Sequence, residues 1–168
     1  MPLSPKARYD DLCDQMNRVR ESFTPQEEVA MSKFDKQRQR LTDLFGTEGV
    51  PAVKTETLER YLDHLKRNLG FPCQLTGIED FPWEEFYVIG PGSKKEHEQL
   101  RKTKPSYMDI YELISFDNVK SRAGIFVNVQ RMSDKKQFVL PLADLKATNK
   151  KSKNYELLDD FSAWFVNW

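Results

Sequence analysis

The period of the hydrophobic residues changes near Phe71, and this change constrains the fold more than any other feature of the chain. Up to Phe71, apolar residues recur every three or four positions, which is the period of a helix that buries one face. Beyond it, the apolar segments are short, aromatic and β-branched, and turn residues separate them, which is typical of strands. A run of helices followed by a run of strands predicts an α+β fold.

Two helices are predicted in the N-terminal part of the chain. Ser4-Pro5 and Thr24-Pro25 each place a capping residue before a proline, which is the order that starts a helix. Because only a short turn separates the two helices, we expect an antiparallel helical hairpin over residues 1–52. Its narrow apolar stripe either packs on the rest of the chain or forms a homodimer contact. The stripe consists of Tyr9, Leu12, Met16, Val19 and Phe23 in the first helix and Ala30, Phe34, Leu41 and Phe45 in the second, which Gly46 ends.

Residues 53–168 are predicted to form a separate domain, because the loop from Thr47 to Val53 contains Gly49 and Pro51. A helix opens this domain and another closes it, and both show apolar residues at helical spacing. The opening helix carries Leu58, Tyr61, Leu62, Leu65 and Leu69, and the closing helix carries Leu157, Leu158, Phe161, Trp164, Phe165 and Trp168.

Short antiparallel strands are predicted between these two helices. The clearest pair is Gly124–Met132 with Gln137–Leu142, in which apolar and polar residues alternate on both sides of a Ser133–Lys136 turn. Pro141 predicts an edge strand, because proline cannot donate to a ladder. Glu85–Ile89 and Tyr107–Ser115 are further strand candidates, with a polar loop or short exposed helix over residues 90–105 and a basic linker over residues 146–153. We interpret the whole as a small SH3-like antiparallel β-barrel with a C-terminal helix.

The composition limits the function classes. Lys plus Arg and Asp plus Glu both number 26, so the chain is neutral, whereas a dedicated nucleic-acid binder is usually basic. The sequence shows no membrane-spanning apolar run and no signal pattern, which predicts a cytoplasmic protein. Cys13 and Cys73 are too few for a disulfide framework or a zinc site. His64 and His97 are expected on the surface, and the absence of a P-loop, dinucleotide or hydrolase motif predicts a protein that is not an enzyme.

Clustered carboxylates carry the candidate chemistry. Calcium takes six to eight oxygen ligands, and like charges about 4 Å apart repel by about 1 kcal/mol even in water, which a cation would relieve. The sequence contains no EF-hand loop. The residues leave open a calcium site, ordinary solvated acids paired with lysines, or a metal-assisted hydrolase. The first-choice ligands are Glu79, Asp80, Glu84 and Glu85, and the second choices are Asp109, Glu112, Asp117, Asp144, Asp159 and Asp160.

Two lysine-rich segments are candidate partner-binding surfaces, with solvated linkers as the alternative. Basic clusters attract phosphates or acidic proteins. The segments lack the interleaved aromatic residues that a single-strand binder uses, which favours a protein partner over nucleic acid. The candidates are Lys94, Lys95, Arg101, Lys102 and Lys104 in the first segment and Lys150, Lys151 and Lys153 in the second.

Short motifs follow one another in the last part of the chain. P-L-A-D-L begins at Pro141, S-x-N-Y at Ser152, D-D at Asp159 and W-F-x-N at Trp164. With the hairpin before them and the helix after Leu58, they make residues 58–168 similar to the cyanobacterial CcbP-type calcium-binding protein family. The resemblance implies a small β-barrel that binds calcium through surface carboxylates without EF-hands. Calcium binding is therefore the leading functional prediction, and an SH3-like module that binds protein or nucleic acid and has lost calcium binding is the alternative.

Overall fold

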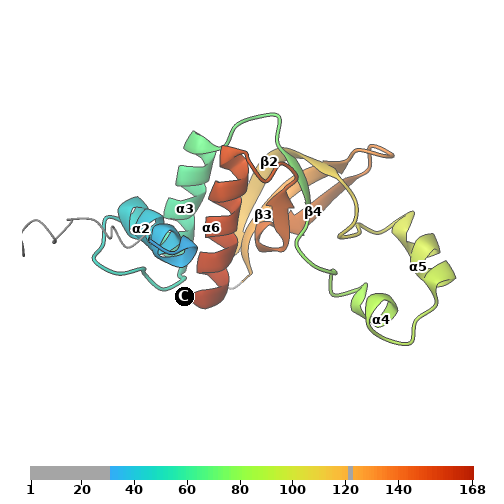
Figure 1. The fold of residues 1–168 in the computed structure, drawn as a ribbon. Coiled ribbons are helices and arrows are strands. Elements are labelled where there is room, and N and C mark those ends of the chain that lie inside the picture. Colours follow the sequence, from blue (N-terminus) through green and yellow to red (C-terminus); the bar gives the residue numbers. More distant parts are fainter. Residues whose placement is uncertain (1–30, 121–122) are drawn as a thin grey trace, which may run out of the picture. The chain divides into compact units, whose positions relative to one another are not determined.

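The structure is a computed structural model that describes residues 31–120 and 123–168 (Figure 1). The chain divides into two compact units, Met1–Lys36 and Gln37–Trp168. The first predicted helix, the turn into the second helix and Cys13 lie outside the described residues, and so does the part of the apolar stripe from Tyr9 to Ala30. Of the helices in the described ranges, none is long and apolar enough to cross a membrane.

Among the described residues, the α-helices that contribute to the core are α2 (Lys33–Phe45), α3 (Thr55–Asn68) and α6 (Lys153–Asn167). The leucine face predicted for the third helix is confirmed, since Leu58 and Leu65 are buried. An aromatic cluster joins α3 to α6, with the Tyr61 and Trp164 rings stacked 5.2 Å apart. Because ring stacking adds to burial, this cluster fixes α6 against α3. Other buried side chains of these helices are Leu41, Phe45, Leu62, Leu157, Leu158 and Phe161.

The predicted second helix is confirmed in its last half only. Leu41 and Phe45 are buried, and Gly46 ends the helix with a left-handed φ of 63°, which glycine adopts without strain. Phe34 was expected on the same stripe, but its side chain is 54% exposed, so that part of the prediction is wrong. The buried position one helical turn before Leu41 is occupied by a polar residue, Gln37.

The strands form one antiparallel sheet in the order β4-β3-β2-β1-β5. They are β1 (Gln74–Gly77), β2 (Tyr111–Lys120), β3 (Gly124–Arg131), β4 (Gln137–Pro141) and β5 (Leu145–Ala147). The sheet is open, with β4 and β5 as its edges, and a single 3₁₀ turn (η1, Leu142–Asp144) connects them. The α+β class is therefore confirmed, and so are the β3–β4 hairpin and the edge position of the strand that holds Pro141.

Three sequence predictions about strands and linkers are wrong. Residues 85–89 form a helix, α4 (Glu85–Val88), because the N–H groups of Val88 and Ile89 donate to carbonyls one helical turn earlier. The Tyr107–Ser115 candidate begins only at Tyr111, because the N–H of Asp109 donates to the carbonyl of Ser106 and closes a turn. The basic linker is shorter than predicted, since Lys146 lies in β5 and Lys153 begins α6. Both β1 and β5 were missed, because strands of 4 and 3 residues are too short to show alternation.

A long segment containing two helices separates β1 from β2 (Figure 1). The helices are α4 and α5 (Lys94–Arg101), and α5 confirms the short helix expected in this region. Ser93 caps α5 by accepting the N–H of Glu96. His97 was expected on the surface but is only 8% exposed, because its imidazole turns inward to the carboxylate of Glu84.

Candidate functional site: a pocket lined by three helices

The four first-choice calcium ligands have very different surroundings. Glu84 is fully buried, and its carboxylate contacts Ser106 Oγ at 2.6 Å, His97 Nε2 at 2.9 Å and the backbone nitrogen of Tyr107 at 2.9 Å. Glu79 and Glu85 are exposed, and Asp80 is half-buried. A carboxylate satisfied by protein donors has little capacity left for a cation. Glu84 therefore acts as a structural anchor for the segment between β1 and β2.

Two of the second-choice acids are also engaged by arginines. Asp160 is buried and accepts Arg40 Nε at 2.6 Å and Arg40 Nη2 at 2.7 Å. Asp109 accepts Arg101 at 3.1 Å and Arg131 at 2.9 Å. Such bidentate and multiple contacts hold a carboxylate in place more firmly than a single exposed pair does. The other four second-choice acids are half-buried: Glu112, Asp117, Asp144 and Asp159.

The acids do not converge on one point. Within residues 31–120 and 123–168, no group of three or more His, Cys, Asp or Glu side chains is placed to hold a metal ion. One acid pair does interact electrostatically: burial and the charge of Glu79 raise the pKa of Asp144 above its ordinary value. Asp144 belongs to the P-L-A-D-L motif and is the last residue of η1, the turn between β4 and β5.

The candidate partner-binding residues belong to the two segments expected from the sequence. The residues around α5 are exposed except Arg101, which is half-buried and forms an ion pair with Asp109. The Lys104 ammonium lies 5.3 Å from the centre of the Trp83 ring. Lys150 and Lys151 are exposed in the turn before α6. Arg101 and Lys102 line a hollow of about 260 Å³ beside Asp109 and Arg131, and Lys153 lines a larger pocket formed by three helices.

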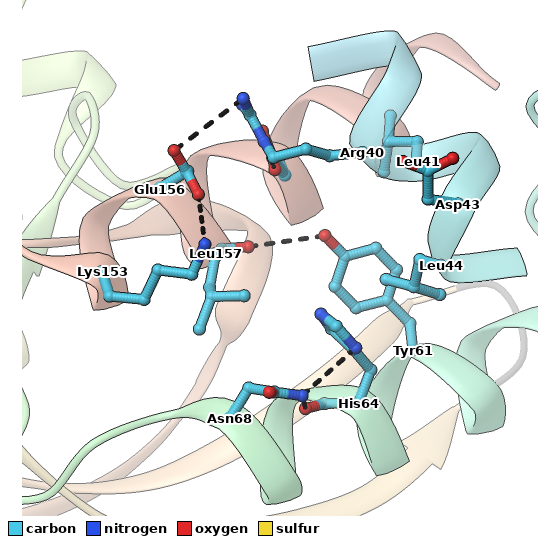
Figure 2. Close-up of a pocket in the computed structure, with 11 residues that line it drawn as sticks. Arg40, Leu41, Asp43, Leu44, Tyr61, His64, Asn68, Lys153, Glu156 and Leu157 are labelled. Atoms are coloured by element: carbon cyan, nitrogen blue, oxygen red, sulfur yellow. Dashed lines mark hydrogen bonds and ion pairs between the residues drawn. The ribbon is translucent and has the colours of Figure 1, made fainter. Parts of the chain in front are cut away.

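This pocket has a volume of about 470 Å³ and lies between α2, α3 and α6 (Figure 2). The volume falls in the range of about 300–1,000 Å³ that is typical of small-molecule sites. Three leucines and the Tyr61 ring supply apolar lining, and charged or polar groups supply the rest. The lining residues are Arg40, Leu41, Asp43 and Leu44 from α2, Tyr61, His64 and Asn68 from α3, and Lys153, Glu156, Leu157 and Asp160 from α6.

Ion pairs fix the α2 and α6 side of the pocket. The bidentate contact with Asp160 raises the pKa of Arg40, so this guanidinium stays charged and oriented. Lys153 pairs with Glu156, and the same contact lowers the pKa of Glu156 below its ordinary value. Asp160 and Glu156 thus each have a cation beside them, so neither is a free base for general acid–base chemistry, whereas Asp43 accepts an amide hydrogen bond from Gln39 at 2.8 Å.

Tyr61 and His64 form the α3 side. Burial raises the pKa of the Tyr61 hydroxyl, which therefore stays protonated and donates to the carbonyl of Leu157 at 3.4 Å. His64 was expected to be solvated but is half-buried beside the Tyr61 ring, 6.0 Å between centroids. Burial is the main cause of its lowered pKa, and the charges of Lys153 and Arg67 add to it. The His64 imidazole is therefore neutral at pH 7.

Sequence reasoning missed this pocket, although a signal existed. Tyr61, His64 and Asn68 are spaced three and then four residues apart, and so are Lys153, Glu156 and Asp160. That spacing places three side chains on one helical face. Polar stripes beside the apolar stripes of two neighbouring helices predict a mixed pocket, but only if the two helices are known to pack together.

Comparison of the chain with protein-family models, with curated proteins and with solved structures finds no match.

Proposed function

We propose that this protein is a non-enzymatic binding module whose ligand site is the pocket between α2, α3 and α6. The observation that carries the proposal is the combination of about 470 Å³ of partly apolar space with polar groups already held in place by ion pairs. Preorganised groups reduce the ordering cost of binding. The pairing of Asp160 and Glu156 with cations supports binding over catalysis at this site.

The fold supports the SH3-like interpretation of the sheet. A meander from β1 to β4 is followed by a 3₁₀ turn, and β5 returns to pair with the free edge of β1. This order leaves β4 and β5 as neighbours in sequence, so one further pairing between them would close a small barrel. A scaffold of this kind carries its binding function on attached segments, here the helices that line the pocket.

Titration with phenol, followed by backbone amide shifts, tests the proposed site. Phenol matches the apolar lining and can hydrogen-bond the polar groups, so we expect saturable shifts at Leu44, His64 and Leu157. The variant Leu44→Trp should abolish these shifts by filling the pocket, whereas Val139→Trp, on an exposed position of β4, should leave them unchanged. Phenol that shifts no lining residue, or that binds Leu44→Trp as well as the unchanged protein, would disprove the proposal.

A calcium site around Asp144 is the second candidate function. The raised pKa of this carboxylate reflects its burial and the nearby Glu79 charge, and a divalent cation would relieve both costs. The sequence resemblance to the CcbP-type family points the same way, because Asp144 lies in a shared motif. Backbone carbonyls and water would have to complete the coordination, since calcium needs six to eight oxygens.

Calorimetric titration of chelator-treated protein with calcium, and with magnesium in parallel, tests this candidate. We expect saturable heat with calcium that the double variant Asp144→Asn, Glu79→Gln removes. Asp63→Asn is the matched control, because Asp63 is an exposed acid on α3. Absence of heat in the unchanged protein refutes calcium binding and leaves the pocket proposal standing, because the two sites share no residue.

A further inference from the structure

The pocket has an apolar part and a polar part, and its polar part continues into a neighbouring hollow. Leu41, Leu44, Leu157 and the Tyr61 ring form the apolar part. His64 and Asn68 also line a second hollow of about 220 Å³, together with Arg60 and Arg67. His64 therefore lies where the two spaces meet, and Figure 2 shows its ring directed into the space between α3 and α6.

Four cations and four carboxylates surround His64, and two of the cations have the strongest electrostatic effects on it. Lys153 and Arg67 both lower its pKa, and they outweigh the opposite effect of Asp160. The reason is visible in the contacts, because Arg40 neutralises Asp160 with two hydrogen bonds. The charged and titratable groups around His64 are Arg40 and Asp43 on α2, Arg60, Tyr61, Asp63 and Arg67 on α3, and Lys153, Glu156 and Asp160 on α6.

Asn68 fixes which nitrogen of His64 carries the proton. The Asn68 Nδ2 amide lies 3.3 Å from His64 Nδ1 and also donates to the His64 carbonyl at 2.8 Å. An amide nitrogen can only donate, so Nδ1 is the acceptor and the proton of the neutral ring is on Nε2. The Nε2–H group is consequently a donor that is available to a ligand in the pocket.

We infer that the ligand of this pocket is a small organic anion with an apolar body. Its carboxylate or phosphate group accepts hydrogen bonds from Nε2 of His64 and from Lys153, and its body packs on Leu41, Leu44 and Leu157. The inference rests on the proposed function and adds the charge of the ligand to it. An anion beside His64 offsets the two cations and favours the protonated imidazole. The proton goes to Nδ1, so binding takes up a proton and breaks the hydrogen bond from the Asn68 amide to Nδ1.

Titration with benzoate tests the inference, because benzoate resembles phenol in its ring but carries a charge that is constant above about pH 5.5. We expect the pKa of His64, followed by its imidazole carbon-bound proton signals, to rise by about one unit at saturating benzoate. Phenol should leave it unchanged. His97, which lies outside the pocket, is an internal control in the same spectra. Phenyl phosphate in place of benzoate tells whether the site favours a phosphate or a carboxylate.

Two variants make the test specific to the pocket. Lys153→Gln should weaken benzoate binding about tenfold while leaving phenol binding unchanged, because it removes one of the two groups that bind the carboxylate. Lys151→Gln, an exposed lysine nearby in sequence, should change neither. Phenol that binds as tightly as benzoate, with no shift of His64, overturns the anion inference and keeps the proposed function. Binding of neither probe overturns both.

Discussion

Replacement of Glu84 by alanine should destabilise the segment between β1 and β2 more than any other single change there. The carboxylate is fully buried and accepts hydrogen bonds from the Ser106 hydroxyl and from the backbone N–H groups of Phe81 and Tyr107. His97 contacts it at 2.9 Å. Removing one partner of a buried charged network costs about 3–5 kcal/mol, because the other partners stay buried without their bonds.

Glu84→Gln should cost less, about 1–2 kcal/mol. One carboxylate oxygen faces two fixed backbone donors, and the other faces a hydroxyl and an imidazole that can each accept. A glutamine can therefore direct its oxygen to the backbone and its amide to Ser106 and His97. It loses the strength of charge-assisted bonds but leaves no donor unpaired.

Two methods measure the loss of stability in both variants. Hydrogen exchange of the Tyr107 amide reports the loss in the segment between β1 and β2, and urea unfolding reports the loss for the whole protein. The matched control is Glu85→Ala, because Glu85 is the next residue in the chain and is exposed, so its removal should change stability by less than about 0.5 kcal/mol. The reasoning is refuted if Glu84→Ala costs no more than Glu85→Ala, or if Glu84→Gln costs as much as Glu84→Ala.

Three further predictions concern the core and the pH dependence of stability. Phe161→Ala should lower the free energy of unfolding by about 3–5 kcal/mol in urea titrations, because this ring is fully buried against Tyr61, whereas Val166→Ala at a 76% exposed position should change it by under about 0.5 kcal/mol. Arg131 holds the pKa of Asp134 down to about 2, so the stability that this carboxylate contributes is complete above its ordinary pKa and is lost as pH falls toward 2. Arg131→Gln should therefore move the midpoint of acid unfolding to higher pH, and an unchanged midpoint would contradict this account. The lowered pKa of His64 means that the unfolded chain binds a proton more readily than the folded one, so stability should fall as pH drops below about 6.5. His64→Gln should reduce that slope in urea titrations at a series of pH values, and a slope equal to that of the unchanged protein would show that other groups cause it.

The elements that could be predicted from the sequence are those with a long, regular hydrophobic pattern. The face of α3 with Leu58 and Leu65 and the face of α6 with Phe161 and Trp164 are buried as their spacing indicates. The β3–β4 hairpin also follows its pattern, because alternation over two adjacent segments fixes both the pairing and the buried face. In such elements local preference and tertiary packing agree.

The polar contacts could not be predicted, because their partners are distant in the sequence. Glu84 meets Ser106 and Tyr107 across a turn and two helices, and Arg40 on α2 meets Asp160 on α6. In a sequence, a buried and an exposed glutamate look alike, so the acids between positions 79 and 85 could only be grouped by proximity. Grouping by proximity makes Glu84 a candidate calcium ligand, but it does not reveal that this carboxylate accepts hydrogen bonds inside the protein.

The pairing of β1 with β5 has a consequence for how the protein is made. Leu75 pairs with Ala147, about 70 residues later, whereas β2, β3 and β4 pair with their neighbours in sequence. During synthesis at about 5–20 residues per second, the edge of β1 stays without its partner for several seconds after β1 itself has been made. Throughout that interval the nascent chain exposes a strand edge of the kind that recruits other strands, and the β2–β4 meander can form before the edge is covered.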